Sequence, residues 1–232
     1  MWHATVTTSW DDGHALDLRL AALLKKYGIR GTFYIAPKNR EIDPAERLNA
    51  AQIVELAAGF EIGAHTITHP RLTDISDVAA RKEIEESKAY LECILKKDVN
   101  SFCYPAGDYD KRHMAYVREA GFTYARTVAC FSLDGGKDKF AAPTTVHAYR
   151  HWSRALPILK YVGVTRFINC YLNWDALAIA LFDKVRAQGG VFHLWGHSWE
   201  IEKNNGWQRL EKVLQHIAHR PDVRYCANSE LS

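Results

Sequence analysis

Strand-like and helix-like segments alternate along almost the whole of this 232-residue chain. Short runs rich in β-branched and aromatic residues indicate buried strands, and longer segments of helical period lie between them. The expected strands are residues 4–8, 32–35, 60–64, 101–104, 122–126, 144–149, 191–195 and 223–226. The expected helices are residues 14–27, 49–58, 77–97, 110–120, 174–188 and 207–219. This alternation predicts an α/β fold with a parallel sheet or barrel, in which the loops after the strands share one edge.

The chain is long and apolar enough to fold as one domain. Hydrophobic residues make up 47% of the sequence, which suffices for a substantial core at this length. No internal repeat, low-complexity tract or linker divides the sequence. We therefore expect a single domain over residues 1–232.

Charge and cysteine usage limit the expected partners and compartment. The formal net charge is only +3, so we expect neither nucleic acid nor a membrane as partner. No stretch approaches the roughly 18 consecutive apolar residues of a spanning helix. The five Cys residues are scattered, and the first expected strand starts too early to leave room for a secretory signal. We expect reduced thiols and a cytoplasmic protein, unless a targeting segment has been removed; no pattern indicates an oligomeric state.

Two short polar segments follow expected strands and carry metal-binding chemistry. Asp11 and Asp12 come at the end of the first strand, and Gly13 provides a turn that lets both carboxylates face one cavity. His65 and His69 follow the third strand in a loop closed by a proline. One carboxylate and two imidazoles can hold a divalent ion with positions open for water and substrate. The remaining carboxylate can serve as a general base, so the pair of segments predicts a metal hydrolase.

In these segments the chain resembles the polysaccharide deacetylases with a NodB homology domain, carbohydrate esterase family four. The first motif of that family, Thr-Phe-Asp-Asp-Gly, resembles residues 9–13, with Trp10 in place of Phe. The second motif, His-Ser/Thr-x-x-His-Pro, is matched in full by residues 65–70. Matching segments run from near residue 5 to near residue 228, and the resemblance implies a distorted, incomplete (β/α) barrel.

The resemblance also implies roles for the residues of the two motifs. Asp11 would be the general base of the reaction. The implied ligands of a divalent metal, for which we expect zinc, are Asp12, His65 and His69.

A third segment, residues 102–109, departs from the pattern of the family. The usual motif reads Phe-Arg-x-Pro-Tyr-Gly, and a backbone N–H at its Tyr position assists the oxyanion. On this match Ala106 would supply the N–H, which any residue type can do. Cys103 stands where the family has the Arg that contacts the catalytic Asp. Arg126 or Arg150 is a candidate replacement from another strand.

A fourth segment, residues 192–200, contains two histidines that compete for the role of general acid. The family protonates the departing amine with a His near the end of its last motif. His193 lies within the strand and is expected to be structural, whereas His197 follows Gly196 at the strand end. We expect His197 to be the acid, with Glu200 as a candidate to orient it and Asp175 as a weaker one. The residues expected to contact substrate are Trp10, Tyr104, Leu194 and Trp195.

Together these segments predict metal-dependent hydrolysis of an amide C–N bond. The expected substrate is an N-acetylated sugar or polysaccharide, from which the N-acetyl group is removed. One alternative is an amidohydrolase of a small cyclic ureide or formamide on the same fold, since the third motif lacks its Arg. Two others are O-deacetylation of an ester and a non-catalytic carbohydrate-binding protein with a vestigial metal site.

Overall fold

The computed structural model describes residues 2–231 and, for Trp152, the backbone alone. Its centre is a sheet in which every strand pair is parallel. The order across the sheet is β5-β4-β3-β2-β1-β7-β6, and β8 pairs with the first residues of β1. The strands are β1 (Ala4–Asp12), β2 (Thr32–Ile35), β3 (Glu61–Ala64), β4 (Ser101–Cys103), β5 (Tyr124–Arg126), β6 (Val146–His147), β7 (Gly190–Gly196) and β8 (Val223–Tyr225).

The sheet curls without closing into a full barrel. Arg126 on the edge strand β5 reaches Asp11 on β1, with three strands between them in the order of the sheet. Residues 127–145 span the gap between the edges, since Ala142 N donates to Ala125 O and Thr145 N donates to His193 O, both at 3.0 Å. The predicted distorted (β/α) barrel is therefore confirmed.

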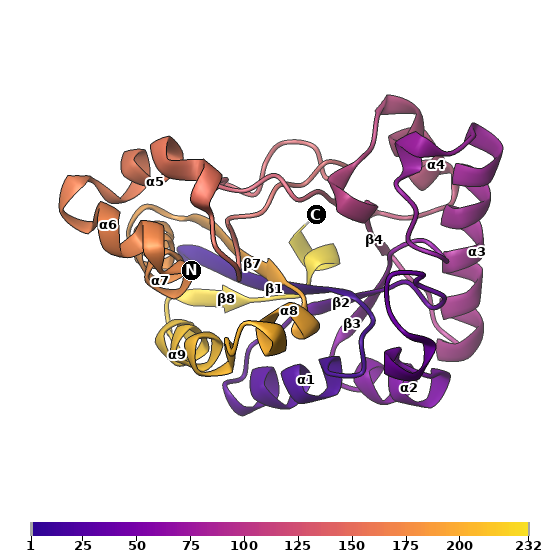
Figure 1. Cartoon of the computed structure of the whole chain (residues 1–232), viewed down its shortest axis with the longest axis horizontal. Helices are drawn as coiled ribbons and strands as arrows, with labels where there is room; N and C mark the ends of the chain where they lie inside the picture. Colours follow the sequence, from indigo (N-terminus) through magenta and orange to yellow (C-terminus); the bar gives the residue numbers. More distant parts are fainter. Residues whose placement is uncertain (1, 232) are drawn as a thin grey trace.

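Helices surround this sheet (Figure 1). In that view α1 and α2 lie below the strands, α3 and α4 at the right-hand end, and α5, α6 and α7 at the left-hand end. The helices are α1 (Asp17–Lys26), α2 (Ala50–Ala57), α3 (Asp77–Leu95), α4 (Lys111–Glu119), α5 (Ala155–Val162), α6 (Val164–Leu172), α7 (Trp174–Gln188), α8 (Ser198–Lys203) and α9 (Trp207–Ile217). Short 3₁₀ turns are η1 (Pro44–Glu46), η2 (Leu72–Asp74), η3 (Pro105–Gly107), η4 (Trp152–Arg154) and η5 (Asn228–Leu231).

Side-chain caps fix the starts of three predicted helices. The Asn49 side chain accepts from Gln52 N at 3.0 Å, and the Gln52 side chain accepts from Asn49 N at 2.9 Å. Ser76 caps α3 through Ala79 N, and Asp110 caps α4 in a second capping box. Each cap satisfies backbone N–H groups that a helix start leaves free. These starts therefore lie within one residue of their predicted positions.

Three helices were not predicted, and several predicted ends differ: β1 extends to Asp12 and α1 begins at Asp17, against predicted bounds of 8 and 14. The segment around α5 and α6 and the short helix α8 were not predicted to be helical. Neither α5 nor α6 begins with a side-chain cap, Pro157 lies inside α5, and only Gly163 separates the two. Strand β6 is shorter than the predicted 144–149 at both ends, and just before it the Thr145 hydroxyl bonds to Ser132 O at 2.8 Å in the bridging loop.

The large apolar side chains of the core lie between one face of the sheet and the helices that cover it. Fully buried members include Phe33, Phe102, Phe182 and Phe192. Among residues 2–231, no helix combines the length and apolar character needed to cross a membrane.

Candidate metal and catalytic site

The predicted site segments converge at the carboxyl ends of neighbouring strands. Asp11 and Asp12 end β1, His65 directly follows β3, and His197 directly follows β7. The parallel sheet sets all these strand ends at one edge, where sites of this fold class form. The fold thus brings together residues that lie far apart in the chain.

Three ligand atoms of suitable type form a compact triangle. The distances are 3.2 Å from His65 Nε2 to His69 Nε2, 3.4 Å from His69 Nε2 to Asp12 Oδ1, and 3.7 Å from His65 Nε2 to Asp12 Oδ1. A tetrahedral zinc ion holds its nitrogen and oxygen ligands about 3.3 Å apart. The spacing therefore suits a zinc-sized ion with three protein ligands and an open position.

Further contacts orient each of the three groups. His65 Nδ1 lies 2.8 Å from Cys103 O, so it donates there and leaves Nε2 free as a ligand atom. Glu41 Oε2 lies 2.9 Å from His69 Nδ1. Asp12 Oδ2 accepts from Trp199 Nε1 at 2.8 Å.

The chemistry of these groups fits a cation. Asp12 Oδ1 is buried and has no hydrogen-bond partner among the described residues, which is costly for a carboxylate oxygen unless a cation binds there. Burial, reinforced by the neighbouring His69, lowers the pKa of His65 to about 4. A neutral imidazole is the form that binds metal. Asp12, His65 and His69 could therefore hold a divalent ion.

The loop conformation at the ligands is unusual for residues other than glycine. Asp12 has φ +85°, and Thr66 and His69 each have φ +63°. The turn at the first motif thus begins at Asp12 itself, one residue before the predicted break at Gly13. The histidine loop is held by Glu83, whose carboxylate accepts from Ile67 N and Thr68 N at 2.8 Å each. Conformations of this kind persist only where surrounding contacts enforce them.

Asp11 lies beside the ligands and is held by a buried arginine. Arg126 Nη2 donates to Asp11 Oδ1, and both side chains are almost fully buried. Cys103 Sγ lies 3.7 Å from the other oxygen of Asp11. Burial alone would raise the pKa of Asp11, but the Arg126 charge, with smaller contributions from His65 and His197, lowers it to about 2. Asp11 therefore stays ionised across the neutral range.

Arg126 occupies the place left open by the missing motif arginine. Cys103 on β4 and Arg126 on β5 are register partners, so their side chains lie next to each other on one face of the sheet. The guanidinium also lies over the rings of Tyr34 and Trp195, at 5.1 and 4.9 Å from the ring centroids. From the sequence, Arg126 was only one of two candidates, because a sequence does not show which residues of neighbouring strands are register partners.

His197 belongs to a small polar cluster with Glu200 and His147. Glu200 Oε2 lies 3.3 Å from His197 Nδ1 and 2.9 Å from His147 Nε2, and His197 Nε2 lies 4.0 Å from Asp12 Oδ2. Burial would lower the pKa of His197, but the Glu200 hydrogen bond and the Asp12 and Asp11 charges raise it to about 9. A protonated His197 can give up a proton next to the metal ligands. The sequence analysis did not identify His147, which no motif marks.

His193 and Asp175 were the other residues considered for roles near His197, and both make contacts elsewhere in the fold. His193 Nε2 lies 2.8 Å from Ser9 Oγ inside the sheet, and burial, with the Arg126 charge, lowers its pKa to about 3. Asp175 accepts from Lys212 at 2.9 Å and lies 3.5 Å from Arg209, so Glu200 and not Asp175 orients His197.

The predicted oxyanion donor is placed by a tight turn. Ala106 is exposed in η3 with φ +54°, and Gly107 follows with φ +72°. A Cβ atom at Gly107 would lie 2.3 Å from Val128 Cγ2, so only glycine fits there. The turn thus presents the backbone of Ala106 at the same edge as the other segments.

The predicted substrate contacts are mostly core residues. Trp10, Tyr104 and Leu194 have no exposed surface, which contradicts the prediction that they line a substrate pocket. Trp10 Nε1 donates to Thr8 Oγ1 and Tyr104 OH donates to Phe140 O, so both polar groups are satisfied internally. Trp195 is 6% exposed and stacks on His147 with ring centroids 4.0 Å apart. The aromatic spacing in the sequence did not distinguish a pocket wall from core.

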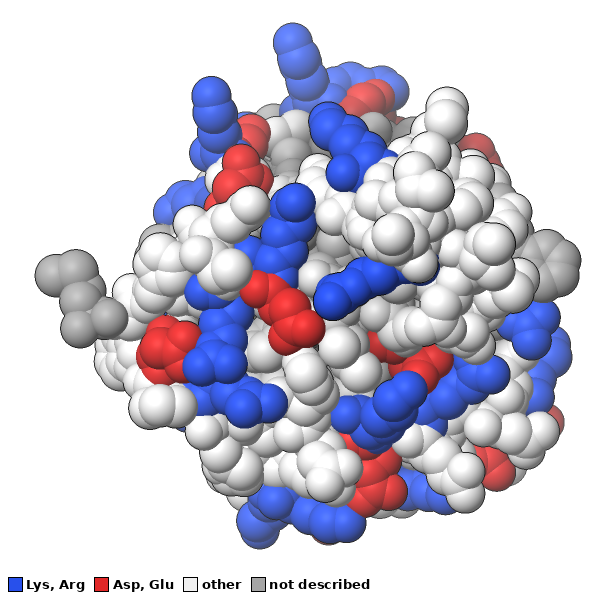
Figure 2. Space-filling model, turned by 90° about the vertical axis from the view of Figure 1, so that its left-hand side faces the viewer, with Lys and Arg blue, Asp and Glu red and all other residues white. Residues whose placement is uncertain are grey.

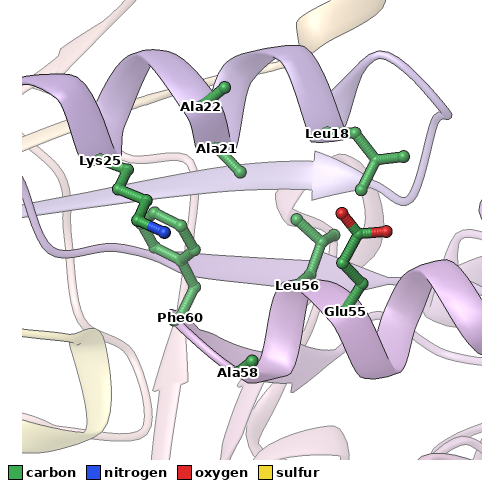
Figure 3. Close-up of a pocket in the computed structure, with 9 residues that line it drawn as sticks. Leu18, Ala21, Ala22, Lys25, Glu55, Leu56, Ala58 and Phe60 are labelled. Atoms are coloured by element: carbon green, nitrogen blue, oxygen red, sulfur yellow. The ribbon is translucent and has the colours of Figure 1, made fainter.

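A surface hollow of about 400 Å³ lies away from this site, between α1 and α2 (Figure 3). Leu18 and Leu56 form part of its wall, and Lys25 and Glu55 extend along it. None of the predicted catalytic or metal-binding residues lines it. Its position on the outer helices separates it from the strand ends.

Comparison with known proteins agrees with this architecture. The sequence profile described as "Polysaccharide deacetylase" matches residues 3–125. A putative polysaccharide deacetylase from Mycobacterium smegmatis aligns with a TM-score of 0.70 at 17% identity, over 99% of this chain and 89% of that chain. No curated protein sequence matches the chain significantly.

Two further structures show the range of this fold. The deacetylase PplD of Streptococcus pyogenes, solved with acetate, aligns with a TM-score of 0.55 at 22% identity, over 59% of this chain and 62% of that one. The chain thus spans less than two thirds of that protein. A CE4 family pseudoenzyme from Bacillus anthracis aligns with a TM-score of 0.57 at 14% identity, over 98% of this chain and 64% of that chain. Similarity at this level concerns the fold alone, whereas the profile match covers more than half of the sequence: the chain belongs to the polysaccharide deacetylase family.

Proposed function

We propose that this protein is a metal-dependent deacetylase that hydrolyses the N-acetyl group of an acetylated carbohydrate. The observation that carries the proposal is the triangle of Asp12 Oδ1, His65 Nε2 and His69 Nε2 beside an ionised Asp11. A pseudoenzyme shares the fold, so the case depends on the completeness of these side chains and not on similarity. We propose zinc as the ion, because two imidazoles and one carboxylate with an open position suit it. When bound, such an ion supplies Lewis acidity, lowering the pKa of a coordinated water and polarising a carbonyl.

The surrounding residues have complementary roles in the proposal. Asp11 accepts a proton from the attacking water, and Arg126 fixes its carboxylate in place. Ala106 donates its backbone N–H to the oxyanion of the tetrahedral intermediate. His197, protonated and held by Glu200, gives its proton to the departing amine. Trp195 packs against Arg126 and His147 and holds them in place, and it does not contact the substrate.

We propose that the deacetylase domain occupies the whole chain, residues 1–232. The alignment with the Mycobacterium smegmatis structure over 99% of the chain supports this extent. The β7 and α8 residues of the fourth segment lie beyond the profile match, yet His197 and Trp199 contact Asp12. These contacts support a domain, and a site, that include the second half of the chain.

The test is release of acetate from N-acetylglucosamine oligomers by the protein loaded with zinc. We expect Asp11→Asn to retain zinc and lose at least about a hundredfold in rate, because a general base contributes roughly that much. We expect His65→Ala to lose zinc together with activity. His216→Gln, which changes a surface histidine paired with Asp183, is the control and should match the wild type.

Two results would overturn this assignment. Hydrolysis that persists in both Asp11→Asn and His65→Ala with zinc retained would exclude these residues from the chemistry. Hydrolysis of cyclic ureides or formamides without acetate release would assign the same site to an amidohydrolase of small substrates.

A further inference from the structure

Exposed aliphatic side chains gather on one part of the molecule that the proposed activity does not use. This is the α5–α6 hairpin, residues 155–172, in which two short helices pack against each other around Gly163. Of the eight large hydrophobic side chains that are exposed among the described residues, five lie here. They are Leu156 (80% exposed), Leu159 (36%), Val164 (82%), Ile168 (70%) and Leu172 (54%).

On α6 these residues form a continuous stripe. Val164, Ile168 and Leu172 follow one another at intervals of four residues, so they share one face of the helix. The opposite side of α6 packs inward through Cys170, which is buried. An exposed stripe of this kind is unusual for a helix of a globular domain, whose solvent face is normally polar.

The chain segment that contains the stripe carries charges of one sign. From residue 139 to residue 174 the sequence has no Asp or Glu. The same segment has five basic residues, of which Arg154, Lys160 and Arg166 lie in the hairpin or directly before it. Figure 2 shows the side of the molecule that carries α5 and α6, where blue Lys and Arg side chains border uncharged surface and red carboxylates are fewer.

The acidic residues of the adjoining helix are already engaged. Asp175 on α7 is buried and contacts Lys212 and Arg209. Asp183 on α7 pairs with His216 at 2.7 Å. The hairpin therefore presents an apolar stripe together with positive charge.

We propose that the α5–α6 hairpin docks on the surface of an anionic lipid bilayer. Amphipathic helices with aliphatic residues on one face and Lys or Arg beside them lie in the interface of such membranes. The basic residues match the negative surface of the bilayer, and the aliphatic stripe matches its acyl boundary. The net charge of +3 conceals this feature, because the remainder of the chain offsets the local excess of cations.

Two other occupants of the hairpin fit the observations less well. A second copy of the chain in an isologous contact would bring two hairpins of the same positive charge together, where like charges repel. A protein groove recognises anchors that are commonly aromatic, whereas the exposed residues here are all Leu, Val and Ile. Figure 1 also places α5 and α6 at the outer edge of the molecule, where a flat surface can reach them.

The experiment is flotation of the full chain with vesicles of phosphatidylcholine alone and of phosphatidylcholine mixed with phosphatidylglycerol. We expect the wild type to float with the mixed vesicles at low salt, and more weakly at high salt because added ions screen the surface. Val164→Glu/Ile168→Glu should lower the partition coefficient at least about tenfold, since it removes apolar contact and adds repulsion. Lys160→Glu/Arg166→Glu should lower it by a similar factor, since one basic residue contributes about fivefold.

A matched control is provided by a valine on another helix. Val78 on α3 is 79% exposed, nearly the same as Val164 at 82%, and it lies in the first turn, where Glu is favourable. Val78→Glu should float like the wild type. Circular dichroism melting of every variant shows whether it remains folded.

The outcomes that would overturn the proposal are clear. One is a wild type that does not float with the mixed vesicles, and another is equal flotation of Val164→Glu/Ile168→Glu and Val78→Glu. Wild-type chains that form a dimer in light scattering, which Val164→Glu/Ile168→Glu dissociates without any vesicle binding, would assign the hairpin to self-association. Binding of an acidic protein without vesicle binding would also replace the bilayer as its partner.

Discussion

Asp11 is paired with an arginine that lies 115 positions later in the sequence. The guanidinium is fully buried and reaches its partner across the inner face of the curled sheet. A buried charge that loses its partner costs about 3–5 kcal/mol, so each member of this pair depends on the other. Cys103 lies beside both groups, at the position that the family motif gives to arginine.

This arrangement predicts that arginine can move between the two strands. Arg126→Cys should lower stability by about 3 kcal/mol and strongly reduce the rate, because Asp11 loses its counter-charge. The double variant Cys103→Arg/Arg126→Cys should recover a large part of both, because the two residues are register partners. The measurements are melting temperature and kcat/KM across pH.

The pH profile distinguishes positioning from a merely structural effect. Arg126 lowers the pKa of Asp11, so its removal raises that pKa and shifts the acid limb of the profile to higher pH. The double variant should shift the limb back. An Arg126→Cys enzyme with a wild-type profile would contradict the role of Arg126.

Asp17 is a second buried carboxyl, close to the site at the start of α1. Burial is the main cause that raises its pKa well above the ordinary value, and the Asp12 and Asp11 charges add to it. A raised folded-state pKa means that stability is fully present at low pH and is lost as pH rises above the unfolded value near 4. Asp17→Asn removes that loss.

We therefore expect metal-free Asp17→Asn to unfold at a higher temperature than the wild type at pH 7. The gain should exceed about 1 kcal/mol, since one pKa unit is worth about 1.4 kcal/mol. It should shrink toward zero as the pH is lowered to 4. Melting curves across this range are the check, and equal melting temperatures at pH 7 would refute the expectation.

Among the elements, η3 sets the position of the proposed oxyanion donor. Gly107→Ala should destabilise the protein by about 2 kcal/mol or more, because it combines φ +72° with a contact of 2.3 Å to Val128. It should also lower kcat, since the Ala106 N–H moves. Gly59→Ala is the matched control, because a Cβ atom there meets nothing within 4 Å. Equal melting temperatures for the two variants would show that η3 adapts freely.

The elements also show what the sequence could and could not predict. Helices with side-chain caps, such as α2 after Asn49 and α3 after Ser76, were predicted to within a residue. Local hydrogen bonds determine those boundaries, and local patterns reveal them. The α5–α6 hairpin has neither caps nor the usual polar outer face, so no local pattern indicated it.

The same division applies to the candidate site. Motif spacing identified the five groups around the proposed metal, including Asp11 and His197. Arg126, Glu41 and His147 reach the site through register and loop packing, which depend on contacts between distant segments. The burial of Trp10 and Tyr104 likewise depends on contacts with distant segments, such as the bond from Tyr104 OH to Phe140 O.

At the scale of the whole molecule, the proposed metal would link the ends of the first and third strands of the fold. An ion held by Asp12 and the two histidines stabilises only the folded chain, because the unfolded chain has no preformed site. At a hundredfold excess over Kd the gain is about 2.7 kcal/mol, which corresponds to a rise of roughly 5–10 °C in Tm for a chain of this size. Calorimetry with and without zinc measures it.

Histidine variants are the controls for this shift. His65→Ala should abolish the rise in Tm, and His216→Gln should retain it in full. A shift of wild-type size in His65→Ala would place the ion elsewhere on the protein.

The left-handed conformation of Asp12, Thr66 and His69 has a consequence for the history of such proteins. Each residue of this kind costs about 1–3 kcal/mol that glycine would avoid, so glycine at Thr66 or at either of the two proposed ligands would make the fold more stable. As long as selection maintains catalysis, glycine is excluded from these positions despite the stability that it would add. In a lineage released from such selection, drift should replace them with glycine or asparagine before it reaches the buried strands, so these three positions record whether a descendant is still an enzyme.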